Sequence, residues 1–200
     1  MKVMLDCSPA KLTEYRERYA FDFWQLRTPL TKYARASAGI PYGLDNGCFA
    51  EFRQDTWERL LDEALNDPPL WACLPDIVGD AARTLDLFDA FYNRTHGVRR
   101  ALVLQDGIER FRIPWDRLEA VFVGGTDRFK CSPEALAAAR TAKMLGKWVH
   151  VGRVNTSARV DFWLGLADSL DGSGISRYDH MLEDVLTVLK GEHPQQEMSA

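Results

Sequence analysis

Residues 119–152 read EAVFVGGTDRFKCSPEALAAARTAKMLGKWVHVG, which is two short apolar runs separated by a helix-forming segment. Ser132-Pro133-Glu134 places a hydroxyl at the N-cap of that segment, proline at its first helical position and an acid in its first turn. The alanine-rich stretch that follows ends at Gly146, a residue type that often terminates helices. Strand, helix and strand in this order predict a βαβ unit with parallel strands.

The same alternation extends along most of the chain. Helical segments are also predicted around residues 80–95, 156–166 and 178–190; Asp80 caps the first of these, and Asp55 to Glu58 is predicted to be a capping box. Eight apolar runs recur, at residues 2–5, 21–26, 40–45, 71–78, 100–105, 119–125, 147–152 and 166–171. Eight such strands predict a compact (β/α)8 barrel, and an open doubly wound sheet is the alternative.

We expect residues 1–190 to form a single domain and residues 191–200 to be a flexible tail. The connection 28–39 shows no clear helix. The apolar share of 46% and the charged share of 27% are ordinary for a globular chain, and the net charge of −4 gives no overall basic field to attract nucleic acid. Four widely separated cysteines form no C-x-x-C pair, which favours a reducing cytosol over a disulfide framework or zinc knuckle. We expect a cytoplasmic protein with no membrane partner, because no signal peptide or membrane-spanning run is present.

Polar residues stand at the ends of the predicted strands. In a parallel barrel these ends form the active-site mouth. Helix capping is the competing explanation for strand-end aspartates. Several carboxylates at one mouth repel one another, which favours a ligand site. The set consists of Asp6, Asp45, Asp76, Gln105, Asp106, Gly124, Gly125, Gly152, Arg153 and Asp171.

Four of these strand ends resemble motifs of the tRNA-guanine transglycosylase superfamily. Leu44-Asp-Asn-Gly-Cys-Phe49 is similar to the family's aspartate-small-glycine-x-phenylalanine motif, and Val103 to Gly107 to its glutamine-bearing strand. Val121-Phe-Val-Gly-Gly-Thr126 resembles the Val-Gly-Gly turn, and Ala167-Asp-Ser-Leu-Asp-Gly172 the late strand that carries the nucleophile. The four occur in the family's order.

The resemblance implies a (β/α)8 enzyme that exchanges a purine for guanine or a 7-deazaguanine. Asp171 would be the nucleophile on the sugar C1′ and Asp45 the acid/base. Asp76 and Gln105 would bind the base edge, with the Gly124 and Gly125 amides at its carbonyl. This chemistry follows the two-carboxylate logic of retaining glycosidases.

This sequence also departs from the family pattern. No cysteine follows Cys131, so we expect the family's zinc site to be missing, and we expect no appended RNA-binding domain. These departures resemble the branch, found in phages and bacterial modification clusters, that inserts 7-deazaguanines into DNA. We therefore expect no metal and no cofactor, with DNA favoured over tRNA as partner and a free 7-deazaguanine base as co-substrate.

Basic side chains near the same strand ends are candidates for holding flanking phosphates on one rim, although each alone is also typical of a solvated surface residue; they are Arg128, Lys130, Arg153 and Arg177. A protein partner that supplies nucleic-acid surface would fit the acidic charge. Two alternatives stay open: a nucleosidase or deoxyribosyltransferase acting on free nucleosides, and a non-catalytic barrel that serves as a scaffold or binding subunit. Asp168 is interpreted as a structural neighbour of Asp171, and His150 as a satisfied interior or interface histidine rather than a catalyst.

Overall fold

Eight parallel strands close into a barrel in which each strand pairs with the next and β8 pairs with β1. This computed structural model describes residues 1–31 and 33–191. The strands are β1 (Lys2–Leu5), β2 (Trp24–Arg27), β3 (Tyr42–Leu44), β4 (Trp71–Cys73), β5 (Arg100–Leu104), β6 (Ala120–Val123), β7 (Trp148–Val151) and β8 (Ser169–Asp171). The closed ring confirms the predicted (β/α)8 barrel and excludes the open sheet.

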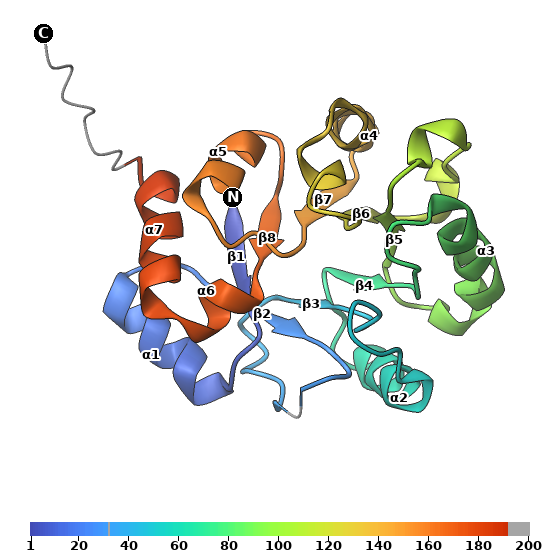
Figure 1. Ribbon diagram of the computed structural model, residues 1–200. Helices are drawn as coiled ribbons and strands as arrows, with labels where there is room; N and C mark the ends of the chain where they lie inside the picture. Colours follow the sequence, from blue (N-terminus) through green and yellow to red (C-terminus); the bar gives the residue numbers. More distant parts are fainter. Residues whose placement is uncertain (32, 192–200) are drawn as a thin grey trace, which may run out of the picture.

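Helices surround the barrel (Figure 1), and its first strand, β1, pairs with its last strand, β8. The helices are α1 (Pro9–Tyr19), α2 (Gln54–Ala64), α3 (Ala81–Phe91), α4 (Pro133–Met144), α5 (Ser157–Trp163), α6 (Ser173–Arg177) and α7 (Asp179–Leu189). Short 3-10 turns are η1 (Tyr92–Thr95), η2 (Ile108–Arg110), η3 (Trp115–Arg117) and η4 (Phe129–Cys131). Of the predicted tail, residues 192–200 lie outside the described residues. No described helix combines the length and the hydropathy needed to cross a bilayer.

The predicted start of α4 is confirmed, and the predicted capping box of α2 is wrong. Ser132 Oγ accepts a hydrogen bond from the Ala135 amide, as expected for an N-cap serine. Helix α2 instead begins after Arg53, and no side chain caps it. Its first helical residue is Gln54, one residue before the predicted N-cap, so Asp55 lies inside the first turn.

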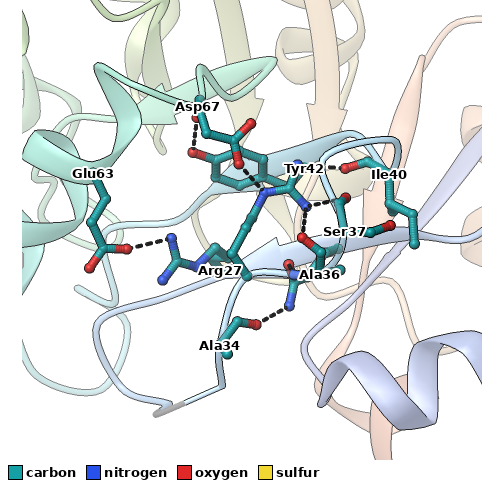
Figure 2. Close-up of polar contacts among 10 residues, drawn as sticks. Arg27, Ala34, Ala36, Ser37, Ile40, Tyr42, Glu63 and Asp67 are labelled. Carbon is teal, nitrogen blue, oxygen red and sulfur yellow. Dashed lines mark hydrogen bonds and ion pairs between the residues drawn. The ribbon is translucent and has the colours of Figure 1, made fainter.

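Between β2 and β3 the described residues, 28–31 and 33–41, form no helix, and polar contacts hold them against the barrel (Figure 2). The guanidinium of Arg35 donates to the carbonyl oxygens of Ala36, Ser37 and Ile40, and its Nε donates to Asp67 at 2.7 Å. Gln25 of β2 adds a bond in each direction, donating to the Ala34 carbonyl and accepting from the Ala36 amide. These bonds satisfy backbone groups that a helix would otherwise pair internally.

Alternate residues of each strand point into the barrel, where large rings fill the space beside glycines. The Trp71 ring lies where a Cβ on Gly43 would be, with its Cζ2 only 2.4 Å from that position. The Phe122 ring takes the corresponding place at Gly152, 2.3 Å from a Cβ built there. Small residues at these positions are therefore required by packing. The other strand face packs on the helices through residues such as Val149, Val151 and Leu170.

Candidate active site

The predicted site residues lie at the C-terminal ends of the strands or in the segments that follow. Asp171 is the last residue of β8, Asp45 and Gln105 directly follow β3 and β5, and Asp76 comes shortly after β4. Because the strands are parallel and closed, all these ends open at one mouth of the barrel. The backbone therefore brings together, from different strands, the polar groups that the sequence placed at strand ends.

Asp171 is held by a histidine that lies inside the barrel. His150 Nε2 lies 3.0 Å from Asp171 Oδ1, and His150 Nδ1 lies 2.8 Å from Ser169 Oγ. The indole nitrogen of Trp148 donates to the same Ser169 oxygen at 2.9 Å. His150 is 0% exposed and Asp171 is 8% exposed, so the contact is shielded from solvent. The expectation of an interior histidine is confirmed, but sequence reasoning missed that its partner is the predicted nucleophile.

Asp45 is in a different electrostatic environment from an ordinary surface aspartate. Loss of solvent raises its pKa from 3.8 to about 7, and the negative charges of Asp171 and Asp76 add to the increase. The backbone amides of Asn46 and Gly47 act in the opposite direction by favouring the carboxylate. A carboxyl group with this pKa can give and take a proton near neutral pH.

Asp76 and Gln105 are hydrogen-bonded to each other. Gln105 Nε2 donates to Asp76 Oδ2, and Gln105 Oε1 accepts from the Gly79 amide at 2.8 Å. Asn46, which the sequence analysis did not select, donates to Asp76 Oδ1 at 2.8 Å. Burial raises the pKa of Asp76, and these side-chain bonds partly offset that increase. Two amide groups thus fix the orientation of this carboxyl group.

Asp6 contributes another carboxyl group to the mouth. Its Oδ1 accepts from Thr31 Oγ1 at 2.9 Å. Burial raises its pKa to about 6; the Thr31 bond lowers it, and the charge of Asp171 raises it further. Among the described residues, no group of three or more His, Cys, Asp or Glu side chains is arranged to hold a metal ion.

The two glycines after β6 differ in what their amides can do. The Gly124 amide donates to the Leu104 carbonyl at 3.0 Å and continues the pairing of the neighbouring strands. The prediction that both amides face a ligand carbonyl is therefore wrong for Gly124. The Gly125 amide has no acceptor among the described residues, and its φ of 73° suits glycine. Asp106 accepts from the Thr126 amide and hydroxyl, which fixes the turn.

The predicted basic rim is only partly present. Arg153 has a left-handed backbone (φ 59°), and its guanidinium lies 3.6 Å from the centroid of the exposed Phe49 ring. Arg177 of α6 is exposed. Lys130 is 2% exposed, so the expectation that it lies on an open rim is wrong. Burial, together with the positive charge of Arg153, lowers the pKa of Lys130 to about 8.

Asp168 has the structural role that was expected of it. Its carboxylate accepts from Lys143 Nζ at 2.5 Å and from the Val149 amide at 2.8 Å. Both partners belong to the outer layer of the barrel wall, on α4 and β7. Asp168 and Asp171 therefore perform different tasks although only two residues separate them.

Comparison with known proteins supports the fold alone. No protein-family model matches the chain, and no curated protein matches it in sequence. Among solved structures, it is similar to a mutant tryptophan synthase alpha-subunit from the hyperthermophile Pyrococcus furiosus. The TM-score is 0.54 at 12% identity, over 94% of this chain and 97% of that one. A likeness at this identity shows that the chain has the (β/α)8 barrel architecture.

Proposed function

We propose that this barrel is a transglycosylase that replaces a guanine in nucleic acid, DNA in preference to tRNA, with a 7-deazaguanine. The proposal rests on the order of the four family-like motifs and on one structural observation. Asp171 and Asp45 share one mouth but have different surroundings: Asp171 binds a buried histidine, whereas the pKa of Asp45 is about 7. Two carboxyl groups in unlike environments are what an acid/base and nucleophile pair requires.

In the proposed reaction, Asp171 is the nucleophile and Asp45 transfers the protons. A carboxylate oxygen of Asp171 forms a bond to the sugar C1′ as the bond from C1′ to the base nitrogen breaks. The electron pair of that bond goes to the departing base, which takes a proton from Asp45. The incoming base then returns a proton to Asp45, its ring nitrogen attacks C1′, and Asp171 leaves as a carboxylate. Protons and bonds balance over the two halves without an oxidant or metal.

Base recognition falls to Asp76 and Gln105. A guanine edge presents N–H donors and a carbonyl acceptor, and a carboxylate and an amide match them. The bond between these two side chains supports the assignment, because a pre-oriented pair loses little freedom when a ligand binds. Of the two amides in the Gly124-Gly125 turn, that of Gly125 would donate to the base carbonyl, because the Gly124 amide is used in strand pairing.

Label exchange tests the proposal. The protein is incubated with radiolabelled guanine or 7-cyano-7-deazaguanine and with either single-stranded DNA or total tRNA. We expect label in DNA, and none with Asp171→Asn. Asp168→Asn is the matched control, since this neighbouring aspartate bonds Lys143 outside the mouth, and it should retain exchange.

The outcomes separate the alternatives. Label in tRNA instead of DNA would keep the chemistry and change the substrate. Exchange on free deoxyguanosine, with none on either polymer, would favour the nucleoside enzyme. No label in any substrate from a folded wild-type protein would refute the proposed function and favour a non-catalytic barrel.

A further inference from the structure

We infer that His150 is a positioning residue, which donates from Nε2–H to Asp171 Oδ1 and leaves Oδ2 to react. This assignment rests on the proposed function for its catalytic meaning and on hydrogen-bond geometry for the contact itself. The residues concerned lie on two neighbouring strands, β7 and β8, whose register pairs His150 with Ser169. Their side chains face the barrel interior.

The donors and acceptors determine the tautomer. An indole nitrogen is only a donor, so the hydrogen bond from Trp148 occupies a lone pair of Ser169 Oγ. The Asp171 carboxylate can only accept, so Nε2 carries the ring proton, and the serine hydroxyl donates its hydrogen to His150 Nδ1, 2.8 Å away. Nδ1 is thereby an acceptor, and the ring proton resides on Nε2, which points at Asp171. The four groups form one directed chain that starts at a donor and ends at the carboxylate.

Packing holds the imidazole in this orientation. Its ring centroid lies 4.5 Å from that of Trp71 and 4.7 Å from that of Phe122. Those two rings occupy space that Gly43 and Gly152 leave open. A ring flip would exchange nitrogen for carbon at both hydrogen bonds while the neighbouring rings confine it. His150 therefore holds its donor in place before any substrate binds.

The two oxygens of Asp171 become inequivalent as a result. Oδ1 accepts from His150, and the Arg153 amide approaches the same atom at 3.4 Å. Oδ2 accepts no hydrogen bond from the described residues. Oδ2 is thus the oxygen that attacks C1′, and in the resulting ester Oδ1 is the carbonyl oxygen. The Nε2–H bond to that oxygen stabilises the carboxylate that forms again when the second base arrives.

The contact can be tested without any activity. In the full-length protein with ¹⁵N-labelled histidine, the His150 ring signals are assigned by their loss in His150→Gln. We expect one protonated nitrogen, Nε2, and one unprotonated nitrogen, Nδ1. Ser169→Ala should disturb this pattern, because it removes the donor to Nδ1. A ring protonated at Nδ1 alone, or at both nitrogens, would overturn the assignment.

The role is tested by single-turnover formation of the covalent aspartyl intermediate, trapped by acid and weighed by mass spectrometry. Losing the contact that holds Oδ2 in position predicts that His150→Leu slows this step about 10- to 100-fold, because a misplaced nucleophile loses its alignment with C1′. His150→Gln, which keeps an N–H at the corresponding place, should recover most of the rate. Val149→Ala, on the helix-facing side of the same strand, controls for loss of packing and should keep the wild-type rate.

Failure of this inference and failure of the proposed function look different. If the wild type forms intermediate and folded His150→Leu forms it equally fast, His150 does not position the nucleophile. If His150→Gln is as slow as His150→Leu, a donor is not what the reaction uses, and the inference is again overturned. If the wild type itself forms no intermediate, the proposed function fails, and the nitrogen signals still decide whether His150 donates to Asp171.

Discussion

Replacing Asp45 by asparagine should stabilise the protein more at alkaline pH than at acidic pH. Burial and neighbouring carboxylates raise the pKa of this group from 3.8 to about 7 in the folded state. Between those values the folded chain binds more protons than the unfolded chain, so stability falls as the pH rises through this range. An asparagine side chain carries no charge at any pH, so the substitution would remove this loss.

The magnitude follows from the two pKa values. One pH unit of difference corresponds to about 1.4 kcal/mol, so the full loss above pH 7 approaches about 4 kcal/mol. Between pH 5 and pH 8 the same values give about 2.5 kcal/mol. Asp45 is partly exposed, and solvent screening lowers this figure, so we expect the advantage of Asp45→Asn to grow by about 1–2.5 kcal/mol over this range.

The assay is urea unfolding of both proteins at pH 5 and pH 8, with the midpoint and slope fitted at each pH. Asp6 and Asp76, whose pKa values burial also raises, are present in both proteins, so their contributions largely cancel in the difference. Asp116→Asn, at an exposed position outside the mouth, is the matched control and should show no pH-dependent difference. An equal stability difference for Asp45→Asn at both pH values would refute the reasoning.

Three further predictions concern the interior and the thiols. Burial lowers the folded-state pKa of Lys130 to about 8, below its ordinary 10.5. The free energy of unfolding should therefore rise as the pH rises between these two values. Lys130→Met should abolish this rise, as measured by urea unfolding from about pH 7.5 to about pH 10. Gly43→Ala should lower the free energy of unfolding by about 1–3 kcal/mol, because its Cβ would lie 2.4 Å from the Trp71 ring; an unchanged urea midpoint would contradict this. Iodoacetamide should alkylate exposed Cys131 well before Cys7, whose pKa burial raises to about 12, as peptide mass spectrometry would show; equal labelling would count against it.

The barrel was predictable because its signals are local and repeated. The βαβ unit at 119–152 carries its own cap, Ser132, and its own stop, Gly146, and both act as expected. The capping box at Asp55 failed because the register of a helix start depends on the chain entering it, and here the first turn begins earlier. The sequence after β2 shows no helical pattern, and the described residues there form no helix. The hydrogen bonds by which Arg35 and Gln25 hold this connection could not be read from the sequence.

The positions of the candidate site residues at strand ends were predictable, but the contacts among them were less so. Asp45, Gln105 and Asp171 stand at strand ends, where periodicity alone places them. The bond between His150 and Asp171 joins residues on different strands, so it depends on barrel closure and register. One signal was present: polar residues at alternate positions of β7 and β8, all on the interior face. Lys130 was misplaced because a charged residue near glycines resembles a surface turn until the neighbouring helices are packed over it.

The contact between Arg153 and Phe49 bears on how tightly a nucleotide can bind at Asp171. These residues follow β7 and β3, which lie on opposite sides of the closed ring, so their contact spans the opening. A cation–π contact of this kind contributes about 0.5–2 kcal/mol. For the proposed transglycosylase, a nucleotide that needs the space between these two side chains would have to give back that free energy on entering, which would weaken its binding without altering the chemistry at Asp171.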